Sequence, residues 1–383
     1  MRGLPLALRP LIIILEGMFS SESILTITMP TAMIILAISS IPVQKKLYIN
    51  GLHKKKEYSN YVTNLAVILT ATLLFISPIL FLILINENDR TLEIGMLIVV
   101  TWLIEKISDE ESRRYEYLKV FSKWFIIQMV RTGWPLVSFL IYFGTSNWGG
   151  SLLLVGFPLA LALVILFLSE KINYIKWRSF NKDDFIDGGY LVVGSTIPAL
   201  AINIPRLQVA VHIPDYANVY LAISQILSII PILYDVLFSI KRRKLISIKP
   251  KKFYNTLKAK NIKIMFFAIS IFTISVISEF YFPYYLDYKL TILYMAALLL
   301  AEILIYTLLN FNLNIIFWHY EGFNAFKYYF IVLTFIMTSY FISFDIITDL
   351  TKSIFSIPIT SFTVIFTAYL LTMNFLQNEH RKK

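Results

Sequence analysis

Long runs of apolar residues alternate with short polar segments along the whole chain. A helix that crosses a lipid bilayer needs about 20 mostly apolar residues, whereas the strands of a membrane barrel have about 10 residues of alternating polarity. The runs are too long and too uniformly apolar for such strands, so the pattern predicts an all-α polytopic membrane protein. We expect about twelve transmembrane helices, over residues 4–15, 24–43, 61–85, 92–107, 120–143, 152–168, 190–211, 219–240, 264–282, 290–309, 328–344 and 354–376.

The composition strengthens this prediction and excludes several kinds of site. Of the 383 residues, 57% are apolar and only 15% are charged, whereas soluble domains carry about 25% charged residues. The chain has no cysteine, and its four histidines are not at metal-ligand spacing. No glycine-rich phosphate loop ending in Gly-Lys-Ser/Thr occurs. We therefore expect no disulfide, no metal, no cofactor and no nucleotide hydrolysis.

The basic residues fall in alternate polar segments. Cytoplasmic loops of membrane proteins concentrate Lys and Arg. With the N-terminus inside, the outside segments contain only Arg90, Lys289 and Lys352. This alternation predicts that both termini are cytoplasmic. It also supports the two short runs, 4–15 and 92–107, because removing either would invert every later loop. The net charge of +11 is thereby explained without a nucleic-acid partner.

The two halves of the chain resemble each other. Long basic loops occupy residues 44–60 and 241–263, about 195 residues apart, and an Arg next to a Pro precedes each loop at Arg9 and at Arg206. Six predicted spans separate the halves, and an even number makes the repeat parallel. The repeat predicts two six-helix bundles, residues 1–182 and 183–383.

One segment carries a resemblance to a known family. Residues 188–245 have a Pro in mid-helix at Pro198, an Arg near the outer end at Arg206, and a short turn leading to Tyr-Leu-Ala. Residues 118–143 add Arg131 within an apolar helix. These features resemble the multidrug/oligosaccharidyl-lipid/polysaccharide (MOP) exporter superfamily. Within it, they are most similar to the Wzx-type flippases, which act on lipid-linked oligosaccharides such as O-antigen repeat units for lipopolysaccharide.

The resemblance implies a function and a location. It implies a transporter, not an enzyme, that flips an undecaprenyl-pyrophosphate-linked oligosaccharide across the bacterial cytoplasmic membrane by alternating access. The implied partners are this lipid-linked sugar, the bilayer, H+ or Na+ as coupling ion, and other polysaccharide-assembly membrane proteins. The topology is similar over the whole chain, although the family's first helix is longer than the run at 4–15.

Polar residues inside the predicted spans are the candidates for function. A charge at bilayer depth is costly, so it faces a cavity, a partner or the interface. Asn203 and Arg206 share one face of the seventh span, and Gln128 and Arg131 share one face of the fifth. We expect these faces to line a central cavity in which guanidinium groups bind the pyrophosphate. The candidates are Arg131, Arg206, Asn203, Arg9 and Gln128 for substrate binding, and Asp235 and Glu302 for ion coupling.

Other interpretations remain open from the sequence. Arg9 and Arg206 could extend to the membrane interface, with their stems in the lipid, and Asp235 could simply pair with a basic residue. A membrane polysaccharide polymerase or glycosyltransferase has a similar span count. Such enzymes carry large external loops, whereas the predicted ones here are short and contain one acidic pair, Asp345 and Asp349. A multidrug exporter of the same superfamily is the other alternative.

Overall fold

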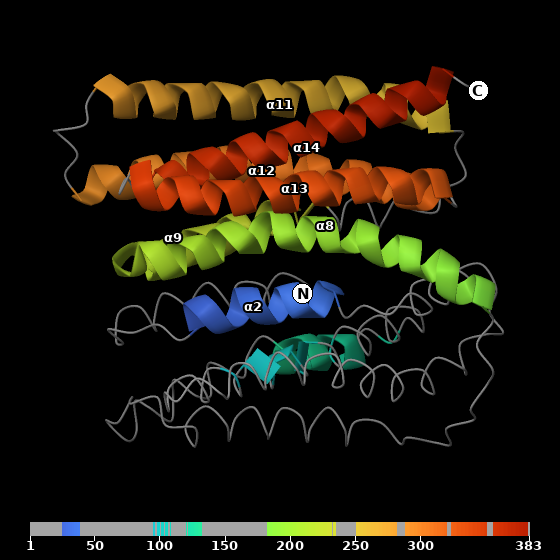
Figure 1. The fold of residues 1–383 in the computed structure, drawn as a ribbon, viewed down its shortest axis with the longest axis horizontal. Helices are drawn as coiled ribbons and strands as arrows, with labels where there is room; N and C mark the ends of the chain where they lie inside the picture. Colours follow the sequence, from blue (N-terminus) through green and yellow to red (C-terminus); the bar gives the residue numbers. More distant parts are fainter. Residues whose placement is uncertain are drawn as a thin grey trace. The chain divides into compact units, whose positions relative to one another are not determined.

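Almost all of the described part of the protein is helical. The computed structural model describes residues 25–38, 95, 98–99, 101–102, 104–105, 108, 120, 122–131, 182–231, 233–234, 250–281, 288–319, 323–350 and 355–381, and none of these residues lies in a strand. This confirms the predicted all-α class (Figure 1). The helices with assigned bounds are α2 (Leu25–Ile38), α8 (Lys182–His212), α9 (Pro214–Leu227), α11 (Pro250–Tyr281), α12 (Tyr288–His319), α13 (Phe323–Leu350) and α14 (Ser356–Arg381).

The chain divides into two compact units, Met1–Val192 and Val193–Lys383. The boundary falls inside α8, whose first residue, Lys182, is where the sequence places the end of the first bundle. In the first unit, α2 is a short apolar helix with Pro30 inside it. That each unit contains six helices stays a prediction, because the predicted spans 4–15, 61–85 and 152–168 lie outside the described residues.

Four helices of the second unit are long and apolar enough to cross a membrane. Each contains a stretch of at least 18 residues that is apolar on average and has at most two charged residues in an 18-residue window, and a helix is the way a chain satisfies its backbone hydrogen bonds in lipid. The last four predicted spans are therefore confirmed as long apolar helices, and the protein is a multi-pass helical membrane protein. The apolar stretches are Asn261–Ser278, Thr291–Ile316, Ala325–Ile342 and Ser356–Asn378.

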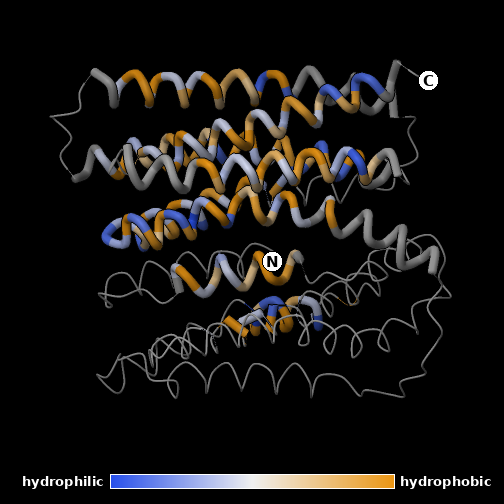
Figure 2. Tube along the Cα trace, viewed as in Figure 1, coloured by the Kyte–Doolittle hydropathy of each residue, from blue (hydrophilic) through white to orange (hydrophobic). Residues whose placement is uncertain are grey.

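Large apolar side chains cover the outer faces of these helices. On α13, Phe341 is 74% exposed, and on α11 Phe266 is 62% exposed and Ile274 is 65% exposed. Figure 2 shows apolar residues, in orange, repeated along the length of α11 and α13. Large exposed apolar surfaces are rare on soluble monomers. We assign these faces to lipid contact.

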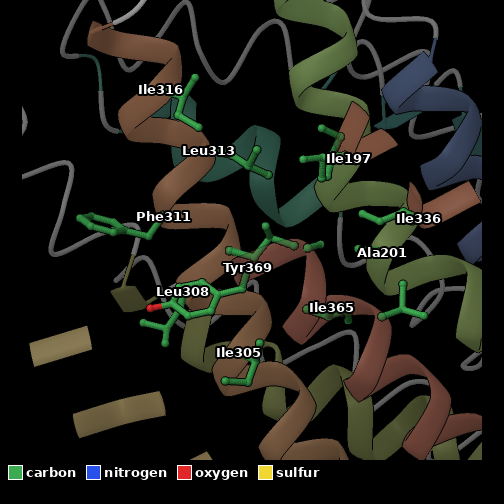
Figure 3. Packing of buried hydrophobic residues seen from close by; sticks show 14 of the residues in the cluster. Ile197, Ala201, Ile305, Leu308, Phe311, Leu313, Ile316, Ile336, Ile365 and Tyr369 are labelled. Atoms are coloured by element: carbon green, nitrogen blue, oxygen red, sulfur yellow. The ribbon is translucent and has the colours of Figure 1, made fainter. Parts of the chain in front are cut away.

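Helix α12 is the centre of the second unit. It packs against α14, α11 and α9, and α13 packs against α14 (Figure 1). A helix that is apolar on all sides is a buried one, and most side chains of α12 between Met295 and Ile316 are buried. Figure 3 shows Ile305 and Leu308 of α12 packed in the same cluster as Ile197 of α8 and Ile365 of α14.

Two predicted loops differ from the structure. Helix α13 continues to Leu350, so Asp345 and Asp349 lie on its last turns and not in an external loop. Helix α11 starts at Pro250, so the second half of the predicted basic loop 241–263 is helical. These helices extend beyond their apolar stretches because polar ends in the headgroup region keep helical hydrogen bonds without crossing the apolar core.

The predicted span 219–240 also differs in its bounds. Helix α9 begins at Pro214, since a proline fits the first helical turn, where its missing N–H is not needed. It ends at Leu227, and a turn at Ser228 precedes further helical residues at 229–231 and 233–234. The Ser228 hydroxyl donates to the Ser224 carbonyl at 2.7 Å, a local bond that competes with regular helix geometry.

Candidate functional site

Pro205 lies inside α8 and determines which backbone carbonyl of that helix needs a donor from another helix. A proline has no N–H, so the carbonyl four residues before it loses its helical donor. Pro205 therefore leaves the carbonyl of Ala201 free. The hydroxyl of Tyr340 on α13 donates to this carbonyl at 2.9 Å. A side chain from another helix thus replaces the missing backbone hydrogen bond, as is needed inside a membrane.

Arg206 follows this break directly, and its guanidinium is buried at 8% exposure. Its Nε donates to Ser224 Oγ at 3.0 Å, and its Nη2 donates to the same oxygen at 2.8 Å. Nη2 also donates to Ser228 Oγ at 3.1 Å, and Nη1 donates to Asn203 Oδ1 at 3.2 Å. Helices α8 and α9 thus build a cradle of two hydroxyls and one amide around the cation, which we call the Arg206 cradle.

The cradle solvates the charge of Arg206 without neutralising it. All the acceptors that the structure gives it are neutral oxygens. The carboxyl group of Glu302 on α12 acts on Arg206 through space, and no direct ion pair joins these two residues in the described part of the chain. A guanidinium forms stronger hydrogen bonds with anionic oxygens than with neutral ones. An anionic ligand that reached Arg206 would therefore compete well against the hydroxyls.

Glu302 lies in a second polar group that borders the cradle. Its side chain is 2% exposed, and its Oε2 has no hydrogen-bond partner among the described residues. Ser361 of α14 acts on its carboxyl group. Ser361 Oγ also lies 3.2 Å from the Tyr340 hydroxyl. Ser361 is therefore a neighbour of Tyr340, whose hydroxyl donates to the Ala201 carbonyl.

Close packing between α13 and α8 holds Tyr340 against the proline break. Gln208 donates through Nε2 to the Tyr340 carbonyl at 3.4 Å. The same two helices also approach closely at Gly194 of α8, where an added Cβ atom would lie 2.8 Å from Cζ of Tyr329 on α13. A larger residue at that position would require the Tyr329 ring or the helices to move. The absence of a side chain at Gly194 therefore permits the approach that brings α13 to α8.

Arg131 of the first unit has an acidic partner. Its Nε lies 2.6 Å from Oε2 of Glu105, and the two side chains are 17% and 4% exposed. Gln128, one turn earlier, is buried at 8% exposure. Arg131 and Gln128 were predicted from the sequence as site residues, whereas Glu105 was not. Glu105 could have been predicted as a partner of Arg131, because a basic residue in mid-span commonly pairs with an acid on a neighbouring span.

The structure brings some of the predicted residues together and leaves others apart. Asn203 and Arg206 are hydrogen-bonded on one face of α8, as predicted, and Glu302 acts on Arg206. Arg131 and Gln128 belong to the other unit, so a cavity shared with Arg206 stays a prediction. Arg9 and the side chain of Asp235 lie outside the described residues. The residues that sequence reasoning missed are Ser224, Tyr340, Ser361 and Glu105.

Within the described ranges, no three His, Cys, Asp or Glu side chains lie close enough together to hold a metal ion. No family model, no curated protein and no solved structure matches the chain.

Proposed function

We propose that the protein is a transporter that flips an undecaprenyl-pyrophosphate-linked oligosaccharide across the bacterial cytoplasmic membrane for surface polysaccharide synthesis. The observation that carries the proposal is the Arg206 cradle. A buried cation in a membrane protein, bound only by neutral oxygens, is expensive to maintain. Such a group is best explained by a ligand that supplies negative charge, and a pyrophosphate head group does so.

The proposed mechanism is alternating access between two six-helix bundles, with about twelve helices and both termini in the cytoplasm. The pyrophosphate would replace Ser224 and Ser228 as the acceptors of the Arg206 N–H groups, while its lipid tail stays in the bilayer. The sugar would pass with the head group. Arg9, Gln128 and Arg131 are the further proposed contacts. H+ or Na+ would be the coupling ion, bound at Asp235 or Glu302, and other polysaccharide-assembly membrane proteins would supply and use the substrate.

The experiment compares surface glycan in a deletion strain that expresses either the wild type or Arg206→Ala. We expect the Ala variant to lose export and to accumulate lipid-linked repeat units that face the cytoplasm. Arg206→Lys should retain only part of the activity, because an ammonium lacks the planar fork of a guanidinium. Lys263→Ala, which removes an exposed cation from α11, is the matched control and should export normally.

The outcomes separate the alternatives. Normal glycan in Arg206→Ala at normal protein level would contradict the assigned site. Repeat units that reach the outer face but stay unpolymerised in the deletion strain would identify a polymerase instead. Drug sensitivity without any change in glycan would identify an exporter of the multidrug type.

A further inference from the structure

The Arg206 cradle contains more hydrogen-bond donors than acceptors. A guanidinium has five N–H groups. In the described part of the chain, Nε gives one to Ser224, Nη2 gives one to Ser224 and one to Ser228, and Nη1 gives one to Asn203. These bonds use four of the five, so one N–H of Nη1 has no acceptor among the described residues. Arg206 is buried, and a buried N–H that lacks an acceptor is costly.

Ser224 supplies a second donor of this kind. Its oxygen accepts two N–H groups from Arg206, which occupies both of its lone pairs. The hydroxyl proton must then point away from the guanidinium, and no group in the described part of the chain accepts it. Ser228 differs, because its hydroxyl donates to the Ser224 carbonyl at 2.7 Å. Ser224 is buried as well, so its proton, like that of Nη1, is available to a group that enters the cradle.

Asn203 binds Arg206 without neutralising its charge. Its Nδ2 donates to the Ala199 carbonyl at 2.8 Å, and this bond leaves Oδ1 to accept from Nη1 of Arg206. A carboxylate could not make the first of these bonds, since it has no proton to donate to a carbonyl. The two bonds together therefore require an amide. Arg131 has a different kind of partner, because a carboxylate oxygen of Glu105 lies 2.6 Å from its Nε.

We propose that Asn203 and Ser224 determine the specificity of the Arg206 cradle for oxyanions. Asn203 holds the guanidinium in place and leaves its charge for the ligand. Ser224 accepts from Arg206 in the structure described, and it donates to the ligand when an anionic oxygen takes over these N–H groups. A phosphoryl oxygen suits such a site, because it carries negative charge and accepts several hydrogen bonds. The inference rests on the proposed function only in identifying that oxygen with the pyrophosphate head group.

The test is calorimetric titration of the full-length protein with inorganic pyrophosphate, in nanodiscs of phosphatidylcholine and well below Tm. We expect the wild type to bind pyrophosphate and Arg206→Ala not to bind it. Ser224→Ala should bind roughly 10- to 100-fold more weakly, which is the effect of losing a hydrogen bond to a charged group. Ser275→Ala removes a buried hydroxyl that bonds within α11, and it should bind as the wild type does. Equal affinities for the wild type and Ser224→Ala would overturn the role of Ser224.

Two further serine variants separate a ligand contact from a structural role. Ser228→Ala also removes an acceptor of Arg206, but it removes no proton that is free to meet the ligand, so it should weaken binding by less than about threefold. Ser224→Thr keeps a hydroxyl and should recover most of the affinity that Ser224→Ala loses. If Ser228→Ala weakened binding as much as Ser224→Ala, both serines would act only by stabilising the cradle, and a direct contact from Ser224 would be refuted.

Two variants of Asn203 test whether the neutrality of this residue matters. Asn203→Asp places a carboxylate beside Arg206 and should neutralise the charge that the ligand needs, as Glu105 does for Arg131. Asn203→Ala removes the acceptor without adding a charge. The Asp variant should therefore bind pyrophosphate at least about tenfold more weakly than the Ala variant. A purely structural role predicts the opposite order, since Asp can still accept from Arg206 and Ala cannot, and that order would contradict the proposal.

A competing lipid distinguishes this inference from the proposed function. Undecaprenyl pyrophosphate in the nanodisc should abolish the binding of inorganic pyrophosphate, whereas undecaprenol, which has the tail without the phosphates, should not. If the lipid fails to compete while the variants of Ser224 and Asn203 behave as expected, the oxyanion site stands, its ligand is a free phosphate compound, and the proposed transport function fails. A wild type that binds neither pyrophosphate compound would overturn the oxyanion site itself.

Discussion

Removing the Ser224 hydroxyl tests how strongly the Arg206 cradle stabilises the second unit. Ser224 Oγ accepts from both Nε and Nη2 of Arg206, at 3.0 and 2.8 Å, whereas Ser228 Oγ accepts once, at 3.1 Å. A hydrogen bond between membrane helices contributes about 0.6 kcal/mol on average and up to about 1.7 kcal/mol, and bonds to charged groups lie at the upper end. Ser224→Ala should therefore destabilise the unit by about 2 to 3 kcal/mol, and Ser228→Ala by about half as much.

The assay is thermal unfolding of the full-length protein in detergent, at one scan rate for all variants because such unfolding is governed by kinetics. For a unit of this size, each kcal/mol lowers Tm by about 2 to 4 °C, so Ser224→Ala should lower it by about 4 to 12 °C. Ser275→Ala is the matched control. Ser275 is 4% exposed, and its hydroxyl donates only to the Ile271 carbonyl of its own helix. Equal Tm values for Ser224→Ala and Ser275→Ala would refute the stabilising role of the cradle.

Two further predictions concern contacts outside the cradle. Glu105→Gln removes the carboxylate that pairs with Arg131 and should cost about 3 kcal/mol, while adding Arg131→Met should recover most of this loss. Thermal unfolding of both variants measures the difference, and a double variant no more stable than the single one would count against the pairing. Gly194→Ala places a Cβ 2.8 Å from Tyr329 Cζ and should cost about 1 to 3 kcal/mol. Tyr329→Leu should relieve that loss in the same assay, and an unaltered Tm for Gly194→Ala would contradict the close approach.

The apolar helices could be predicted from the sequence because lipid imposes one rule on every span. About 20 apolar residues must be helical, and that rule located the ends of the last four apolar stretches to within seven residues. The helix ends were less predictable. Helix α13 continues through Asp345 and Asp349 to Leu350, since a helix can extend into the headgroup region with any polar residues. Apolar length therefore determines where a span lies but not where its helix stops.

The candidate site shows a second limit of prediction from the sequence. Periodicity within one helix placed Asn203 beside Arg206, because residues three apart share a face. The partners from other helices, Ser224 and Glu105, could not be identified in this way. Serines occur throughout these helices, and the sequence contains no information on which one lies opposite a given arginine. Only the packing of α9 against α8 selects Ser224.

The proline break in α8 shows what the sequence predicts about the site and what only the packing determines. Pro205 alone establishes that the Ala201 carbonyl needs a donor from outside the helix. The sequence thus predicts that this carbonyl needs a donor but not which residue supplies it, since any hydroxyl on a neighbouring helix could do so. The structure selects Tyr340, whose hydroxyl also lies 3.2 Å from that of Ser361 on α14. A requirement that arises from one missing N–H therefore joins α8, α13 and α14 in a single polar group. Because Arg206 is the residue next to that proline, any change in the hydrogen bond to Ala201 alters the backbone that positions the guanidinium.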